Sequence, residues 1–370
     1  MIGILPLALT VAAQLDRLIP LALQNRVFLI LIVAIGALFV VTVVLGVIAV
    51  VLRAKNVQKA ARWQRLEARW EPEFLEVLAG RRQPEAVRAL VAPGDELYFV
   101  DLVLRYARRV RGTERDLLAR MAEPFLPPVV ERVHGADAER RARAVQTLGE
   151  LGLPRYDREV ITALDDPSPL VAMIAARALA RRESPQYAAD VLARLHRFTS
   201  WRPSFLASML SSMGPDVAAG LRETLADPSL VSTVRSIAAI ALRQLNDLPS
   251  AAVAVQVLAE GGGDRDLLAA CLRLLGTVGS TEHLSTVRRM TTSDDFVVRA
   301  TAFGALGTLG EPADLARLRE AAYQDVSHWV AISAARALKD SGGADVLRDL
   351  ASAGHVRSSV AMQVLWEVPE

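Results

Sequence analysis

The chain has 370 residues, enough for a large core or a long repeat array, and only 5% of them are aromatic, which leaves little for a β-sandwich to use. Aliphatic residues and alanine dominate, and this composition favours helices. The net charge of +2 is unevenly spread: residues 53–143 hold 19 Lys and Arg against 14 Asp and Glu, whereas residues 144–370 hold 22 against 26.

Residues 1–26 contain an apolar stretch that is too short to span a membrane alone. At helical period, Thr10, Gln14 and Arg17 form a polar stripe, and Pro6 and Pro20 bound the segment. We expect a short interfacial helix on the extracytoplasmic face, or one that packs on the membrane helices of a partner. A signal-like segment cut near residues 11–13 is the alternative, although a basic region at its start is absent.

Residues 27–52 are 26 consecutive residues without a charge. At about 1.5 Å per residue a helix of this length extends roughly 39 Å, more than the roughly 30 Å apolar core of a bilayer. A buried core helix of a soluble protein is the alternative, but such helices keep a polar face and are usually shorter. The run therefore predicts a transmembrane helix.

Cations follow this run much more densely than they precede it, since only Arg17 and Arg26 lie before it. The positive-inside rule then places the C-terminal part of the chain in the cytoplasm and the N-terminus outside. Anionic headgroups suit this basic segment better than nucleic acid does. The expected membrane-anchoring residues are Arg53, Lys55, Lys59, Arg62, Trp63 and Trp70. The two tryptophans could equally form the apolar stripe of a helix that leaves the membrane.

Residues 53–136 read as helices separated by turn signals, with breaks at Pro93-Gly94 and at Gly112. The expected helices are 56–79, 84–91, 95–110, 113–121 and 124–133. Their spacing is irregular, so we interpret this block as a basic helical cap that joins the membrane helix to the C-terminal part of the chain.

A repeat begins near residue 136. A leucine recurs at intervals of 31 or 32 residues, with a final interval of 27: Leu148, Leu179, Leu210, Leu242, Leu274, Leu306, Leu338 and Leu365. Alanine stands four residues before seven of these eight register leucines, and Gly or Asn stands four residues after five of the first seven. Small Ala allows close helix approach, and Gly or Asn accepts the left-handed conformation that ends a helix. Proline then opens the next helix at Pro154, Pro185, Pro215, Pro249 and Pro312.

This pattern resembles the HEAT and HEAT-like repeat family over residues 136–367, most clearly in residues 171–179 and 298–307. The resemblance implies an all-α protein in which residues 137–370 form an α-solenoid, an ARM-type superhelix, of about eight helical hairpins. Asp294 with Arg299, and Arg235, resemble the Asp and Arg ladder of that family. The ladder is broken where the Arg position is held by Ala172, Pro203, Leu267 and Ala331.

The search for chemistry finds no motif that outweighs a structural explanation. The five histidines are scattered and show no metal-ligand spacing. Asp165-Asp166 and Asp294-Asp295 lie in turns, where we expect them to cap the second helix of a hairpin. Cys271 is the only cysteine, so no intrachain disulfide forms, as in a reducing compartment. We therefore expect no catalytic residue, metal or cofactor, and no enzymatic activity.

A binding surface is the remaining candidate. Positions two and nine before each register leucine share one line on the second helix of a hairpin, and in HEAT-like proteins these helices line the concave face. The resemblance therefore implies a face for a partner helix or loop. Its candidate residues are Arg177, Trp201, Ile240, Leu272, Val297, Trp329 and Arg336. Packing against adjacent repeats is the alternative for these residues.

The leading functional hypothesis is a non-enzymatic scaffold, held by one span in a bacterial inner membrane, that positions or regulates a membrane protein complex. Bacterial proteins that resemble it in layout are often associated with membrane glycosyltransferases of extracellular polysaccharide (exopolysaccharide) systems, which suggests that partner class. HEAT-like phycobilin lyases suggest an accessory enzyme subunit as the alternative. Nucleic acid is disfavoured because residues 144–370 carry a net charge of −4, and no small-molecule substrate is expected.

Overall fold

The computed structural model describes residues 26–110, 112–182, 184–260 and 264–367, which are helical and contain no strand. The helical segment expected within residues 1–26 lies almost wholly outside the described residues. The chain divides into two compact units, Met1–Tyr98 and Phe99–Glu370. This division falls within helix α4 (Glu96–Ala107), well before the end of the cap that we expected at residue 136.

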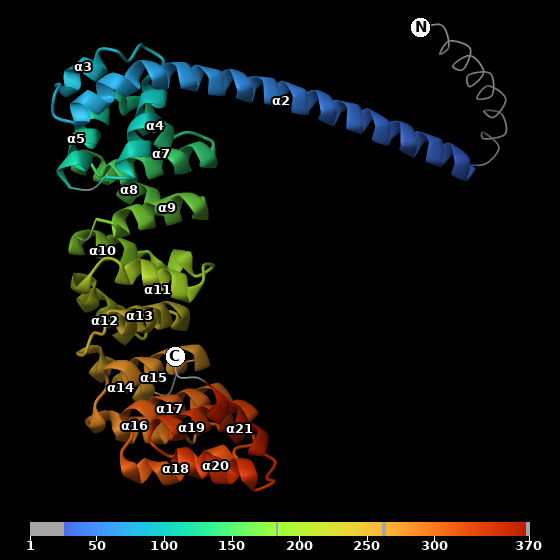
Figure 1. The fold of residues 1–370 in the computed structure, drawn as a ribbon, viewed down its shortest axis with the longest axis vertical. Helices are drawn as coiled ribbons and strands as arrows, with labels where there is room; N and C mark the ends of the chain where they lie inside the picture. The colour runs from blue at the N-terminus through green and yellow to red at the C-terminus, as the bar shows by residue number, and fades with distance from the viewer. Residues whose placement is uncertain (1–25, 111, 183, 261–263, 368–370) are drawn as a thin grey trace. The chain divides into compact units, whose positions relative to one another are not determined.

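The first unit is dominated by α2 (Arg26–Leu78), a continuous helix of 53 residues (Figure 1). The predicted membrane helix and the helix expected at 56–79 are therefore one element, because residues 53–56 contain neither Pro nor Gly to interrupt it. Leu29 to Leu52 expose their side chains throughout, and an 18-residue window of the helix reaches a mean hydropathy of 3.1 with none of it buried. By length and composition this helix can cross a membrane.

The C-terminal part of α2 forms the core of the first unit together with α3 (Pro84–Arg88). Trp70 is fully buried there, and its indole N–H donates to the carbonyl oxygen of Leu90 at 3.2 Å. The expectation that Trp70 anchors the chain at the membrane interface is therefore wrong, because its ring is enclosed by protein. The apolar-stripe interpretation describes it correctly.

Two other expected anchors also contact protein. Arg62 pairs with Asp95 at 2.5 Å, and its guanidinium lies 5.2 Å from the centre of the Tyr98 ring. The half-buried Trp63 lies against the same tyrosine, with 6.0 Å between ring centroids. Arg53, Lys55 and Lys59 are exposed, and these three remain predicted contacts for lipid headgroups.

The second unit begins with the end of α4, α5 (Thr113–Ala122) and η1 (Glu123–Phe125), and continues as helical hairpins. The first helices of the hairpins are α6 (Pro127–Val133), α8 (Asp157–Thr162), α10 (Pro185–Ala193), α12 (Ala218–Ala226), α14 (Ser250–Glu260), α16 (Leu284–Met290), α18 (Leu315–Gln324) and α20 (Ala344–Ser352). The second helices are α7 (Ala138–Leu151), α9 (Pro169–Ala180), α11 (Pro203–Ser211), α13 (Ser232–Gln244), α15 (Arg265–Val278), α17 (Phe296–Leu309), α19 (His328–Asp340) and α21 (Ser358–Trp366).

Short 3-10 helices flank several first helices. They are η2 (Pro154–Tyr156), η3 (Ala163–Asp165), η4 (Leu195–Phe198), η5 (Pro215–Val217), η6 (Thr281–His283) and η7 (Pro312–Asp314). In the described residues these helices follow one another as eight hairpins. α7 pairs with α6, so the first hairpin begins at Pro127, before the boundary that we expected at residue 137. The helix expected at 124–133 is present as α6, but we assigned it to the cap because the repeat was read from second helices, which carry the regular Ala and Leu.

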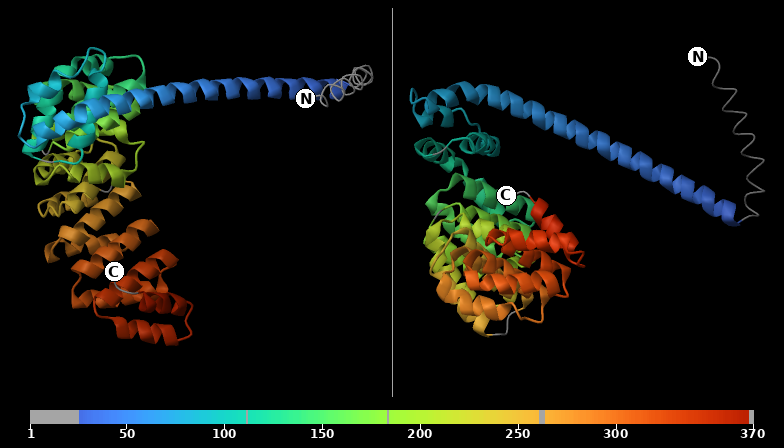
Figure 2. Two further views of the ribbon diagram at one scale, coloured as in Figure 1. Left: turned by 45° about the horizontal axis from the view of Figure 1, so that its top comes forward. Right: turned by 60° about the horizontal axis from the view of Figure 1, so that its bottom comes forward.

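Second helices of successive hairpins pack against one another, and the left view of Figure 2 shows the resulting layers. The first seven register leucines are buried, as are all eight residues that stand four positions before a register leucine. Leu365 differs: it is only half-buried, and Val364 takes the core position in α21. The last repeat is shorter than the others, and the leucine that we assigned to its register position lies one residue after the actual core position.

The helix ends follow the predicted caps at most repeats. Gly152, Gly214, Asn246 and Gly342 have φ of 75°, 88°, 53° and 87°, in the left-handed region. Gly310 differs, because its backbone is extended with φ −61°, yet a Cβ there would lie 2.3 Å from the carbonyl oxygen of Leu306. Four of the predicted prolines open a helix, and Pro249 stands one residue before α14.

Arginine–carboxylate pairs connect consecutive hairpins. Arg141 pairs with Asp166 at 2.8 Å, Arg235 with Glu260 at 3.1 Å, and Arg299 with Asp325 at 3.1 Å. Within its own hairpin Arg299 donates to the main-chain oxygen of Asp294 at 2.9 Å, while its carboxylate partner belongs to the next hairpin. Because each pair joins two repeats, this ladder stabilises the stacking of the hairpins and not a single turn.

Of the two expected carboxylate caps, one is confirmed. Asp295 accepts from the backbone N–H groups of Val297 and Val298 at 2.7 and 3.3 Å. Asp166 instead precedes the N-cap residue Ser168, whose N–H it accepts at 2.7 Å while it binds Arg141. Asp166 therefore serves the ladder, through Arg141, as well as the turn before α9.

The ladder predicts loss of stability in acid. The arginine partners Arg141 and Arg288 hold the pKa values of Asp166 and Asp314 below the ordinary 3.8, against the opposing effect of burial. A carboxyl with a lowered folded pKa stabilises the fold fully above its unfolded pKa, and this stabilisation is lost as pH falls through the folded value. We expect the midpoint temperature of thermal unfolding to decrease as the pH is lowered below 3.8, measured by circular dichroism on the full chain in detergent. Asp166→Asn should flatten this dependence; an unchanged profile would contradict the explanation.

Candidate functional site

The second helices α13, α15, α17 and α19 form a groove with a volume of about 510 Å³. Two of the predicted face residues, Val297 and Trp329, line it. The remaining lining residues are Arg243, Arg273, Gly276, Thr277, Phe296, Ala300, Thr301, Gly304, Ala305, Thr308 and Ser333. The volume is that of a site for a few side chains or a small ligand.

Two exposed aromatic rings stand in the first turns of adjacent second helices. Phe296 directly follows the capping residue Asp295 and is 41% exposed, and Trp329 is the second residue of α19 and is 66% exposed. Neighbouring repeats cover neither ring fully. Exposed rings of this size that lie beside a concavity are typical of a binding surface.

The floor of the groove is made of small residues. Nothing lies within 4 Å of the position that a Cβ on Gly304 would take. Beside it the hydroxyl of Thr308 lies 2.9 Å from the carbonyl oxygen of Gly276 on α15 and 2.9 Å from that of Ala305 on its own helix, so it can link α17 to α15. A ligand can therefore approach the backbone of α17 closely, over a floor that is braced from beneath.

Two arginines without carboxylate partners complete the groove. Arg243 and Arg273 form no ion pair with any residue that the structure describes, in contrast to the arginines of the ladder. Partial burial lowers the pKa of Arg273, and repulsion from Arg243 lowers it further, while Asp266 acts weakly in the other direction. The groove thus combines aromatic surface with an excess of positive charge.

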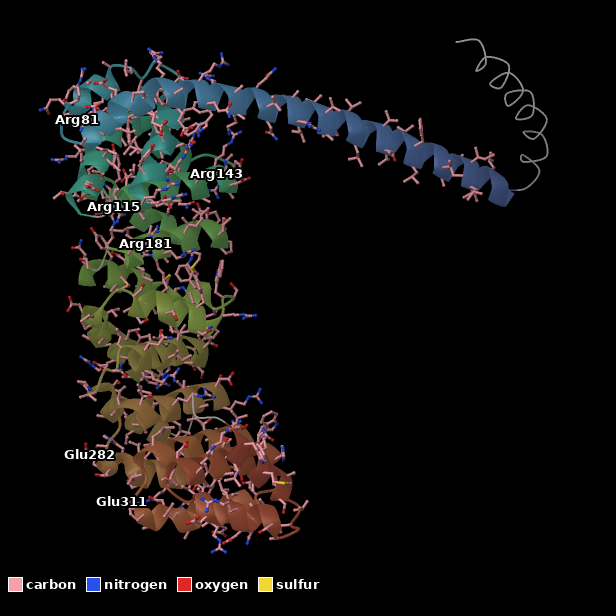
Figure 3. All side chains as sticks on the ribbon, viewed as in Figure 1. Arg81, Arg115, Arg143, Arg181, Glu282 and Glu311 are labelled. Carbon is pink, nitrogen blue, oxygen red and sulfur yellow. The ribbon has the colours of Figure 1, made fainter. Side chains whose placement is uncertain are left out.

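A second basic cluster lies on earlier repeats. Arg108 binds the Glu150 carboxylate at 2.7 and 3.1 Å, and Arg115 donates to the main-chain oxygen of Glu150 at 2.7 Å. Burial lowers the pKa of Arg181. Attraction to Glu150 opposes this shift, whereas repulsion from Arg177, Arg115 and Arg108 adds to it. Figure 3 labels Arg115 and Arg181.

The other predicted face residues lie outside the groove. Leu272 is fully buried, so its assignment to a binding face is wrong, and Ile240 is half-buried. Arg336 is bound to the carboxylate of Glu367 at 2.6 and 2.7 Å. Trp201 is half-buried against Phe205, with 5.8 Å between the ring centroids, and Arg177 is exposed.

Helix rotation explains these errors. On α17 the open positions include Val297 and Gly304, as the register predicted. On α15 they are Arg273, Gly276 and Thr277, and Arg273 stands one residue after the predicted Leu272. One residue corresponds to about 100° of rotation, which turns Leu272 into the core. The missed residues Arg243 and Arg273 directly follow and precede register leucines, and that adjacency was the signal available in the sequence.

Other reactive groups are sparse in the described part of the chain. No group of three or more His, Cys, Asp or Glu side chains is placed there to hold a metal ion. Cys271 is a buried free thiol, and burial raises its pKa to about 12. A thiol of this kind is a poor nucleophile at neutral pH.

Residues 126–202 and 252–339 match the HEAT repeat family, which confirms the resemblance in these two segments. All groove residues except Arg243 lie within the second segment. No curated protein matches the chain.

The solved structures that are similar to this chain include the following three. The complex of CpcE and CpcF of phycocyanin lyase from a Nostoc species matches at 18% identity and TM-score 0.32, covering 64% of this chain and 85% of that one. Human deoxyhypusine hydroxylase in complex with glycerol matches at 17% and 0.30, covering 77% and 99%. An engineered protein matches at 18% and 0.25, covering 71% and 94%.

Proposed function

We propose that this protein is a membrane-tethered, non-catalytic scaffold whose HEAT repeats bind a membrane protein through the groove of α13, α15, α17 and α19. HEAT repeats are protein-interaction modules, and the observation that carries the proposal is the groove itself. There the exposed rings of Phe296 and Trp329 lie in one groove with Arg243 and Arg273.

The apolar half of α2 supports the tether. In water its exposed leucine, isoleucine, valine and phenylalanine side chains would form a large apolar surface, which soluble monomers rarely tolerate. A bilayer removes that cost, and the helix satisfies its own backbone hydrogen bonds within the lipid. Thr42 donates to the carbonyl oxygen of Leu38 at 2.8 Å, so its hydroxyl is satisfied as well.

The proposed arrangement is a single span in a bacterial inner membrane, with the N-terminus outside and the repeats in the cytoplasm. Arg53, Lys55 and Lys59 would then meet anionic headgroups at the inner leaflet. A partner in the same membrane is held at high effective concentration, so a groove of modest size suffices for stable association. The partner class that we propose is a membrane glycosyltransferase of exopolysaccharide synthesis.

Site-specific photocrosslinking in native membranes tests this function. A benzoylphenylalanine placed at Trp329 is expected to crosslink to a polytopic glycosyltransferase, which mass spectrometry identifies. Gly304→Leu should abolish that product by filling the groove. The matched control places the same probe at Trp366, which is 84% exposed but does not line the groove. Equal products from both positions, or products with lipid alone, would contradict the proposal.

A further inference from the structure

The unpaired arginines specify the chemistry of what enters the groove. We infer that the occupant is an acidic segment of the partner protein, whose carboxylate binds Arg243 and Arg273 and whose neighbouring apolar side chain packs against Phe296 and Trp329. This inference rests on the proposed function, because it describes the ligand of the same groove.

The positive charge of the groove is the first argument for an acidic occupant. Elsewhere on the second helices, Arg141, Arg235 and Arg299 each face a carboxylate of the next repeat. Arg243 and Arg273 instead line the same groove without an ion pair to any described carboxylate, and they repel each other, an effect that Asp266 opposes only in part. A bound anion would replace this repulsion with attraction, and the planar guanidinium group matches the two oxygens of a carboxylate.

The aromatic rings of the groove indicate which class of anionic ligand fits best. A free phosphate would use the arginines but leave Phe296 and Trp329 exposed, whereas a peptide places an apolar side chain one helical turn from an acidic one. The net charge of −4 over residues 144–370 disfavours a long polyanion such as nucleic acid. A peptide with both kinds of side chain therefore satisfies more of the groove than these other ligands do.

The floor fits a peptide in size. Ala300 and the open position above Gly304 leave the backbone of α17 accessible, and about 510 Å³ accommodates a few side chains. Because the space above Gly304 is already open, such a segment can enter without moving α17 or α15.

Peptide selection on the full-length protein in nanodiscs of neutral lipid tests the inference. A display library of random twelve-residue peptides is selected on the wild type and counter-selected on Gly304→Leu, and the affinity of enriched peptides is measured by fluorescence anisotropy. We expect enriched peptides to pair Asp or Glu with Leu, Phe or Trp within one helical turn. The double variant Arg243→Glu/Arg273→Glu should weaken them roughly 100-fold and instead enrich peptides with Lys or Arg at the acidic position.

The matched control is Arg177→Glu, a charge reversal at an exposed arginine of α9 that does not line the groove and should change affinity less than about twofold. Groove-dependent peptides that are neutral or basic would overturn the inference while leaving the proposed function intact. The absence of any peptide sensitive to Gly304→Leu would count against both. Equal sensitivity to Arg177→Glu would show non-specific attraction and would also overturn the inference, as would recruitment of anionic-lipid nanodiscs by the groove arginines without peptide.

Discussion

The substitution Gly307→Leu is expected to lower the free energy of unfolding of the repeat array by about 3 kcal/mol, which is at the upper end of the usual cost of overpacking a core. A Cβ at this position would lie 2.7 Å from the Cβ and 2.8 Å from the Cα of Ala337 on α19. The second of these atoms belongs to the backbone, so relief requires movement of a whole helix. Because second helices stack directly on one another, the displacement would separate α17 from α19.

Gly304→Leu provides the matched control within the same helix. This glycine lies one turn earlier and has nothing within 4 Å of its Cβ position, so we expect a gain of about 0.5–1 kcal/mol from helix propensity. Hydrogen exchange on the full chain in detergent measures the two variants locally, because long repeat arrays need not unfold in one step. Equal protection of α17 and α19 in both variants would show that the close contact at Gly307 does not limit stability.

Close contacts between a glycine and an alanine of adjacent second helices recur along the array, and the repeat pattern did not predict them. Gly149 faces Ala178, Gly276 faces Ala305, and Gly307 faces Ala337, each pair joining adjacent second helices. The pattern correctly predicted small residues four positions before the register leucines, where they are buried. It did not reveal this second line of small residues, because Gly149 and Gly307 directly follow register leucines while Gly276 stands one position later.

Elements with a strong period were the predictable part of the fold. The apolar run of α2, the second helices and most of their caps follow from the spacing of apolar, small and capping residues. The face was harder, because each repeat turns its second helix by a different amount; Leu272 became core while Gly304 stayed open at the same register position. Trp70 shows the same limit, since tertiary packing alone determines which side of a helix meets protein.

Cysteine labelling provides a direct test of the predicted membrane topology. Cys271 is buried, and burial raises the pKa of its thiol to about 12, so at pH 8 its thiolate is far rarer than that of an exposed cysteine. The native chain therefore offers a nearly silent background, and Ala353→Cys adds one exposed thiol after α20. With the repeats in the cytoplasm, a membrane-impermeant maleimide should label this variant at least tenfold faster in inside-out vesicles than in intact cells.

The cations that follow the apolar run are expected to determine the orientation of the span in the membrane. Replacing Arg53, Lys55 and Lys59 with glutamate removes the three cations nearest to the span and so reduces the charge asymmetry that orients it. We therefore expect a fraction of the chains to insert in the opposite sense and become labelled in intact cells. The control is Arg81→Glu/Arg82→Glu, which makes an equal type of charge change beyond the end of α2 and should leave the orientation unchanged. Rapid labelling of Ala353→Cys in intact cells without any charge change would place the repeats outside the cell and refute the proposed site of action. Retention of the orientation in the triple variant would instead show that contacts other than these three cations determine it.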